Sequence, residues 1–89
     1  MVIWRVEFSE NAENAMAILD KPIRQRVIGG LEWLSGNFDT IVPLPLGNRW
    51  RGFFKFRVGD WRVIYEIKPN EYALKIHYID HRSKIYKRG

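Results

Sequence analysis

Residues 54–67, FKFRVGDWRVIYEI, contain two runs in which apolar and polar side chains alternate. The first run begins at Phe54, and its apolar residues recur at every second position, as on one face of an extended chain. The second run repeats the pattern from residue 61 onward. Gly59 and Asp60 separate the two runs, and a two-residue connection of this kind is typical of a tight hairpin turn. The stretch therefore predicts an antiparallel β-hairpin with one buried face.

Two further segments alternate with the same period of two. Residues 72–79 do so after Pro69 and Asn70, and they predict a strand that extends the hairpin into an antiparallel meander. Residues 2–8, VIWRVEF, predict another half-buried strand near the N-terminus.

The segment between these strands has helical patterns. Ser9 suits the N-cap of a helix over residues 10–19, whose small apolar side chains permit close approach to a neighbour. Pro22 suits the first turn of a second helix, along which apolar residues recur at helical spacing. Gly29 and Gly30 interrupt that helix, so either its backbone makes a close contact there or the helix is weak at its middle. The two helices predict an α-hairpin.

Residues 36–48 contain two prolines and two glycines without a period, and they predict a loop that packs on the core through Leu44 and Leu46. The expected element order is then β-α-α-β-β-β. It predicts an α+β fold, in which a small antiparallel sheet carries the N-terminal helical hairpin on one face. The chain has 89 residues, so we expect one domain over residues 1–89.

The composition excludes several classes of site. The chain has no cysteine, which removes disulfides, thiolate metal sites and cysteine nucleophiles. His77 and His81 are its two histidines, and we expect neither a metal nor a cofactor. No apolar run is long enough to cross a bilayer, and residues 1–7 do not resemble a signal peptide. We therefore expect a cytoplasmic protein that does not bind membranes.

The positive charge is concentrated in the second half of the chain. The formal net charge is +5, but residues 1–48 hold four basic and six acidic residues, whereas residues 49–89 hold eleven basic and four acidic ones. Two interpretations are open at this point. The basic half binds a polyanion such as RNA, DNA or an acidic protein segment, or it is a solvated surface that keeps a small protein soluble.

Strand alternation predicts that basic and aromatic side chains of this half share one concave surface. Arginine and lysine can bind a phosphate and stabilise charge that grows on it, aromatic rings can stack on unpaired bases, and histidine or tyrosine can transfer a proton. Such a set suffices to cleave RNA through its own 2′-OH without a metal. The alternative is that these residues are ordinary surface and packing residues. The expected cluster contains Lys55, Arg57, Arg62, His81, Arg82 and Tyr86.

Two motifs, residues 54–67 and IDHRSKIY at residues 79–86, resemble those of the RelE/ParE toxin superfamily. The familiar forms there are R-x-G-x-[YW]-R-[VL]-[IV]-Y and a closing H-R-x-x-[IV]-Y. The order and separation of the motifs are fairly specific, and the predicted layout before them also matches, so the resemblance covers nearly the whole chain. It implies a RelE-like fold and a toxin of a type II toxin–antitoxin pair.

The resemblance also implies an activity and a set of site residues. RelE-like members are endoribonucleases that cut mRNA in the ribosomal decoding site. Arg62 matches their phosphate-binding arginine, and Tyr86 matches a tyrosine assigned to base stacking or proton transfer. Phe53 stands where some members have a second lysine. The implied catalytic residues are Arg62, Tyr86, His81 and Lys55, and the implied RNA-binding residues are Arg57, Arg82, Arg51, Phe53 and Lys84.

The partners implied by the resemblance are a cognate antitoxin, with which the toxin forms a hetero-oligomer, and the ribosome with its mRNA. An alternative within the superfamily is a ParE-like toxin, which shares the fold but inhibits DNA gyrase without nuclease activity. A third possibility is a plain RNA-binding domain.

Overall fold

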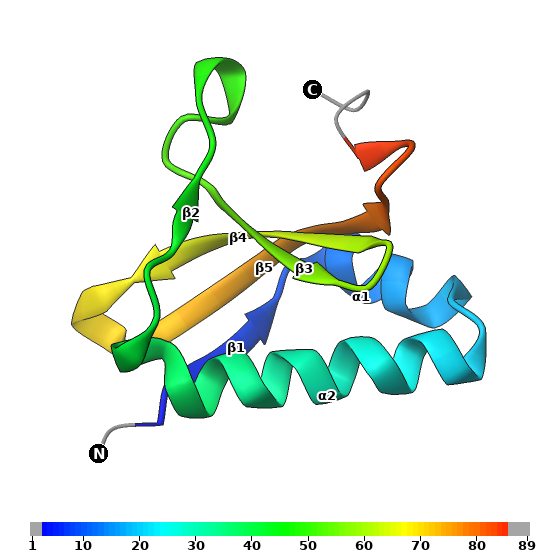
Figure 1. The fold of residues 1–89 in the computed structure, drawn as a ribbon, viewed down its shortest axis with the longest axis horizontal. Helices are drawn as coiled ribbons and strands as arrows, with labels where there is room; N and C mark the ends of the chain where they lie inside the picture. Colours follow the sequence, from blue (N-terminus) through cyan, green and yellow to red (C-terminus); the bar gives the residue numbers. More distant parts are fainter. Residues whose placement is uncertain (1–2, 86–89) are drawn as a thin grey trace.

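The computed structural model describes residues 3–85, in which two helices lie against one face of a five-stranded sheet (Figure 1). The chain order is strand β1 (Arg5–Phe8), helix α1 (Glu10–Ile18), helix α2 (Lys21–Asn37), strand β2 (Leu44–Pro45), strand β3 (Phe54–Val58), strand β4 (Trp61–Lys68) and strand β5 (Ala73–His81). Short 3-10 turns at Phe38–Thr40, Asn48–Trp50 and Pro69–Glu71 connect them. The predicted α+β class and the helical hairpin on one face are confirmed.

The strands lie in the order β1-β5-β4-β3-β2. Strands β3, β4 and β5 form the predicted antiparallel meander, and Gly59 has the positive φ of +59° that the tight β3–β4 turn requires. The sheet differs from the expectation in two respects. It is mixed, because β1 pairs with β5 in parallel, and it gains a fifth strand, because β2 pairs with β3.

The loop expected over residues 36–48 is partly ordered as other elements. Helix α2 extends to Asn37, and Leu44 lies in β2, where 47% of its surface remains exposed. The expectation that Leu44 packs on the core is therefore wrong. Its backbone pairs with Lys55 on the neighbouring strand, so this segment is held by strand pairing instead of apolar burial.

The start of helix α1 is capped as predicted. The Ser9 hydroxyl accepts a hydrogen bond of 3.1 Å from the backbone N–H of Ala12. The end of α1 is held by Arg24 of α2, whose guanidinium donates to three backbone carbonyls. These carbonyls belong to Met16 (2.9 Å), Ala17 (3.1 Å) and Leu19 (2.7 Å). The Met16 carbonyl also accepts from the Leu19 N–H, so Arg24 supplies a second donor there, satisfies the other two oxygens at the helix end and joins the two helices.

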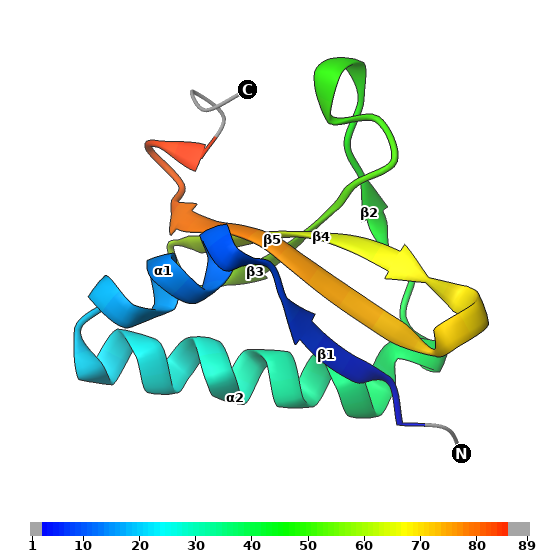
Figure 2. The same cartoon turned by 180° about the vertical axis from the view of Figure 1, so that it is seen from behind.

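The main core lies between the helices and the inner face of the sheet, which is the face that the helices cover (Figure 2). Val27, Leu31 and Leu34 of α2 are buried against inner-face side chains of the meander. Within residues 3–85 no helix has the length and apolarity needed to span a membrane.

The two adjacent glycines of α2 occupy different environments, and we expect opposite effects when each becomes alanine. A Cβ at Gly29 would meet no atom within 4 Å, whereas one at Gly30 would lie 2.8 Å from Val58 Cγ2. Gly29→Ala should stabilise the protein by about 0.5–1 kcal/mol, because it removes backbone entropy from the unfolded chain. Gly30→Ala should be less stable than Gly29→Ala by about 1–3 kcal/mol because of overpacking. Urea unfolding measures both, and equal stabilities would contradict the close contact at Gly30.

Tyr65 of β4, a residue of the first motif, belongs to the core. Burial raises its pKa from 10.0 to about 12. Its phenol therefore stays protonated in the folded protein at pH values where the unfolded chain already loses the proton. The contribution of this phenol to stability should be constant below pH 10 and be lost as the pH rises toward 12. In Tyr65→Phe this loss should be smaller, as measured by urea unfolding at each pH. An unchanged pH profile would contradict the role of burial.

Candidate functional site

The basic residues of the hairpin lie on the outer face of the sheet, defined as the face turned away from the helices. Lys55 and Arg57 alternate with inner-face residues of β3, and Arg57 lies directly opposite Arg62 of β4 in the strand register. Like charges directly opposite each other on paired strands are destabilising. Within residues 3–85 Arg57 forms no ion pair. The pairing of Arg57 with Arg62 therefore places unneutralised positive charge on this face.

Arg62 is held in place by the β3–β4 turn. Its Nη1 donates hydrogen bonds to the Gly59 carbonyl at 2.8 Å and to the Trp61 carbonyl at 3.1 Å. On its other side, Arg62 lies opposite Asp80 of β5 in the register. The guanidinium is therefore fixed near the turn at one end of the outer face, with other N–H groups left to bind a ligand.

Arg82 reaches the same end of the sheet. Its backbone N–H donates to the Asp60 carbonyl at 2.8 Å, and its Nε lies 3.7 Å from Asp60 Oδ1. The segment after β5 is thus tied to the β3–β4 turn, close to the anchored Arg62. We refer to Arg57, Arg62 and Arg82 as the arginine cluster.

A β-bulge in β5 changes which side chains reach the outer face. Ile64 pairs with Tyr78 and Tyr65 pairs with Ile76, so His77 has no partner in the register. Its carbonyl instead accepts hydrogen bonds from Ser9 Oγ at 3.2 Å and from Asn11 Nδ2 at 3.0 Å. The start of α1 therefore holds the bulge. Sequence alternation missed it, although the spacing of the buried Ile76 and Ile79 by three residues is its signal.

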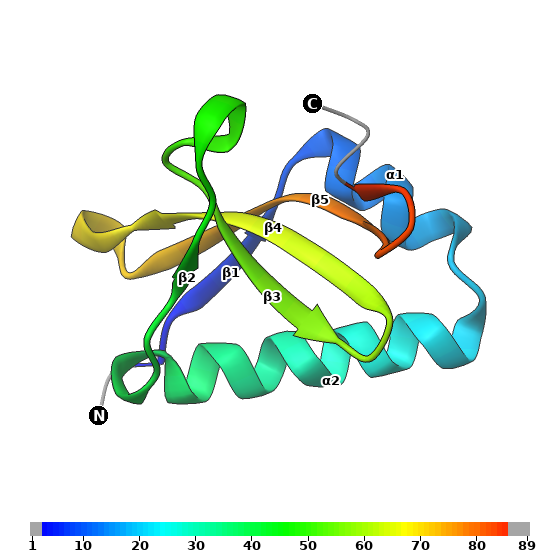
Figure 3. The ribbon, with the colours of Figure 1, turned by 45° about the horizontal axis from the view of Figure 1, so that its top comes forward.

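Two consecutive side chains at the bulge meet polar and aromatic partners. His77 Nε2 lies 3.0 Å from Glu66 Oε1, and its ring packs edge-on against Phe53 with centroids 5.1 Å apart. Tyr78 packs edge-on against Trp50, also at 5.1 Å. Trp50 and Phe53 belong to the arm between β2 and β3, which rises on one side of the outer face in Figure 3. The segment after β5 leaves the sheet at the other end of the same face (Figure 1).

His81 does not join the arginine cluster. It lies opposite the inner-face residue Trp61 in the register, and their rings meet edge-on at 5.6 Å. Its Nδ1 is 2.9 Å from Ser83 Oγ. His81 therefore does not lie on the same surface as Arg62, and the expectation that it does is wrong. The bulge is the reason, because it shifts the alternation of β5 by one residue.

The structure places the remaining candidates around this site. Arg51 and Phe53 precede β3 and lie in the arm, where Arg51 is exposed. Lys84 lies on the α1 side, where it lines a recess with Trp61 and Ile18. Tyr86 lies outside the described residues. Lys55 thus shares the outer face of β3 with Arg57, two residues away, whereas Lys84 and His81 lie elsewhere.

Within the part of the chain that the structure describes, no three histidine, aspartate or glutamate side chains are grouped so that they could hold a metal ion. The chemical groups that the outer face offers are guanidinium, ammonium, imidazole and aromatic rings, together with the carboxylates of Glu66 and Asp80. This combination can bind a phosphate and stack on a base.

A comparison with models of protein families identifies the family of this chain. A model of the family described as the ParE toxin of the type II toxin–antitoxin system parDE matches residues 6–86. No curated protein sequence matches the chain.

Solved toxin structures share the fold. A chain of the RelBE2 toxin–antitoxin complex from Mycobacterium tuberculosis is 28% identical, with a TM-score of 0.82 over 93% of this chain and 95% of that one. A chain of the archaeal RelE–RelB complex from Pyrococcus horikoshii is 21% identical, with a TM-score of 0.71 over 93% and 99%. The isolated RelE toxin of E. coli is 14% identical, with a TM-score of 0.70 over 96% and 97%. The last two likenesses show the fold alone.

The fold is that of the RelE/ParE superfamily of toxins, as the sequence motifs indicated. The chain belongs to the ParE toxin family of type II toxin–antitoxin systems, and it is a toxin of such a system.

Proposed function

We propose that this toxin is a RelE-like endoribonuclease that cleaves ribosome-bound mRNA in the cytoplasm and thereby inhibits translation. The observation that carries the proposal is the direct pairing of Arg57 with Arg62 on the outer face, with Arg82 at the same end. Two opposed arginines cost stability in the free protein, and a bound polyanion would remove that cost.

The proposed chemistry uses the ribose as its own nucleophile. The 2′-oxygen bonds to the adjacent phosphorus and gives its proton to a base, while the bond from phosphorus to the 5′-oxygen breaks and that oxygen takes a proton from an acid. The products are a 2′,3′-cyclic phosphate and a 5′-hydroxyl. Arg62 holds the scissile phosphate, and Arg57 and Arg82 offset the negative charge that grows on it.

The proton-transfer roles fall to Lys55 on the outer face and to Tyr86. We assign no proton-transfer role to His81, because its ring packs edge-on against Trp61 and not beside the arginine cluster. Phe53 offers a stacking surface, and Arg51 extends the positive charge along the arm. Most of the catalytic effect comes from electrostatics and alignment, since no described residue of this face is a strong base.

The proposed partner outside the ribosome is a cognate antitoxin protein that binds the toxin in a hetero-oligomer. Two of the solved relatives carry the names of such complexes, with RelB as the second component.

A second candidate function is inhibition of DNA gyrase without nuclease activity. The matching family model favours it, because that model describes ParE. In that case the arginine cluster would contact a protein or DNA surface and would perform no chemistry.

Induction of the toxin in growing cells separates the two functions. The proposal predicts new 5′ ends within translated messages, detected by primer extension soon after induction, with plasmid supercoiling unchanged over the same interval. Intact messages together with a loss of negative supercoiling would show that the toxin acts on gyrase.

A further inference from the structure

Four aromatic side chains form a closed cluster on the outer face, and Lys55 lies between this cluster and the arginine cluster along the sheet. Neighbouring rings have centroids 6.0, 5.1, 6.5 and 5.1 Å apart around the cluster. All four side chains are partly exposed, so the cluster offers rings on which an unpaired base can stack. We refer to these residues, Trp50, Phe53, His77 and Tyr78, as the aromatic quartet.

A carboxylate lies beside the aromatic quartet. Glu66 Oε1 is 3.0 Å from His77 Nε2, and 42% of the Glu66 side chain is exposed. No lysine or arginine of the described range 3–85 forms an ion pair with Glu66. An ionised carboxylate has about four acceptor positions on its two oxygens, and His77 fills one of them. The other positions are open to a ligand.

The bulge in β5 creates this arrangement. Because of the bulge, the consecutive residues His77 and Tyr78 both lie on the outer face, whereas regular alternation would turn one of them toward the core. Ser9 and Asn11 hold the bulge through the His77 carbonyl. Bulges often redirect a side chain next to a functional site, and this one brings an imidazole to Glu66.

Phosphate binding does not account for Glu66. A carboxylate repels phosphate, so its favourable contacts on an RNA-binding surface are with N–H groups of the bases. Guanine is the base that presents two adjacent donors, N1–H and N2–H, on its Watson–Crick edge. Adenine and cytosine each have an acceptor beside their amino group, and uracil has oxygens on both sides of its N–H. A group that only accepts hydrogen bonds therefore favours guanine.

We propose that Glu66 and the aromatic quartet form a guanine-binding subsite that reads a base near the cleaved linkage. This inference rests on the proposed function, because the RNA that it reads is the substrate of that activity. Arg62 and Glu66 share the outer face of β4, and a strand rises roughly 3.3 Å per residue, which separates their Cα atoms by about 13 Å. The guanine therefore belongs to a nucleotide that flanks the phosphate held by Arg62.

Binding to uncleavable oligonucleotides tests the subsite apart from the chemistry. Short single strands with 2′-deoxy sugars lack the nucleophile, and they carry one guanine or one adenine among uracils. The wild type should bind the guanine strand about tenfold more tightly in titration calorimetry. Glu66→Gln should reverse this preference, because an amide offers one donor and one acceptor, the pattern that matches adenine. Equal affinities, no binding to either strand, or an unchanged preference in Glu66→Gln would overturn the proposal.

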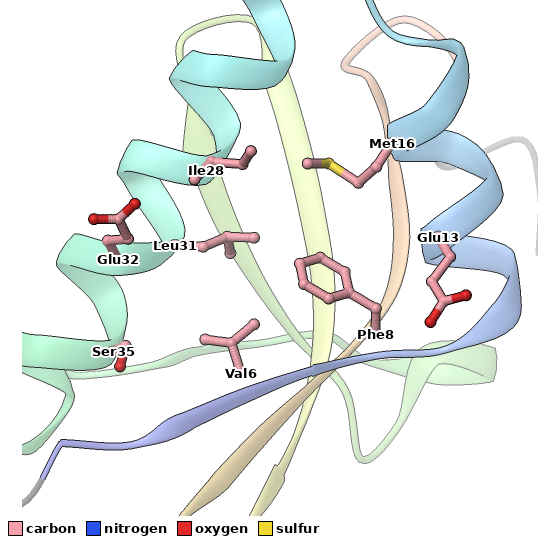
Figure 4. Close-up of a pocket in the computed structure, with 8 residues that line it drawn as sticks. All are labelled: Val6, Phe8, Glu13, Met16, Ile28, Leu31, Glu32 and Ser35. Atoms are coloured by element: carbon pink, nitrogen blue, oxygen red, sulfur yellow. The ribbon is translucent and has the colours of Figure 1, made fainter.

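A second carboxylate provides the matched control. Glu32 lines the apolar groove of about 560 Å³ between β1 and the helices, on the side of the molecule away from the outer face (Figure 4). Glu32→Gln removes the same charge and should keep the guanine preference. Glu66→Gln retains an oxygen that accepts from His77, so it should unfold at the same urea concentration as the wild type. A lower unfolding midpoint with an unchanged base preference would make Glu66 a structural residue only, which overturns the proposal.

Mapping of the 5′ ends on ribosome-bound message separates this inference from the proposed function. The wild type should cut with a guanine at one fixed position relative to the break, and Glu66→Gln should shift that position toward adenine. Cleavage without a base preference would refute the subsite and leave the nuclease assignment standing. Selective binding of the guanine strand without any cleavage of message would instead refute the nuclease assignment.

Discussion

Arg62→Ala should abolish growth arrest and lower the rate of message cleavage by on the order of 100-fold or more. Arg62 is held at the end of the outer face by the carbonyls of Gly59 and Trp61, which both bind its Nη1, so we expect its Nε and Nη2 to bind the phosphate. Alanine removes both the charge and this preorganisation. Arg62→Lys should restore only part of the rate, because an ammonium cannot hold the turn and bind a phosphate in the same geometry.

The control for this variant must exclude loss of the fold. Removing the hydrogen bonds to the turn should cost about 1 kcal/mol, which circular dichroism and urea unfolding will detect as a folded, slightly weakened protein. Lys21→Ala removes one positive charge from the first turn of α2, away from the outer face, and should leave growth arrest unchanged. A folded Arg62→Ala protein with full toxicity would contradict the assigned phosphate contact.

Arg24→Ala should produce a large loss of stability, about 2–3 kcal/mol, without changing the outer face. Its guanidinium donates to three carbonyls at the end of α1, so alanine removes a donor from all three and leaves those of Ala17 and Leu19 without a hydrogen-bond partner among the described residues. Arg24→Lys should recover less than half of the loss, because an ammonium on a flexible stem does not match three acceptors held by a planar fork.

Urea unfolding measures this effect against a neighbouring control. Gln25→Ala changes an exposed residue of the same helix turn and should alter stability by no more than about 0.5 kcal/mol. If the Arg24→Ala protein were as stable as the Gln25→Ala protein, water would replace the three hydrogen bonds at no cost in free energy.

Local patterns in the sequence were sufficient to predict the meander and the helical hairpin. Alternation and a glycine turn determine the β3–β4 register, which is why the opposition of Arg57 and Arg62 on one face could be expected. Ser9 likewise signals the start of α1 through a contact that spans three residues. These features depend on neighbours close in sequence, so one chain contains enough information to find them.

Features that depend on distant contacts were not predictable. The parallel pairing of β1 with β5 joins segments about 70 residues apart in the chain, and no local pattern specifies it. The bulge at His77 is held through its carbonyl by Ser9 and Asn11, which lie 68 and 66 residues away in the chain. Without the bulge, strand alternation assigns the residues of β5 after His77 to the opposite face of the sheet. It therefore predicts His81 on the outer face, where the structure does not place it.

One assay compares the two functions directly with the purified toxin. The toxin is added to ribosomes translating a defined message, and in parallel to DNA gyrase with a relaxed plasmid. The account predicts cleavage of the message within its coding region, with 5′-hydroxyl ends, and undiminished supercoiling by gyrase. An intact message with inhibited gyrase would contradict the central claim that the outer face is an RNA-cleaving surface.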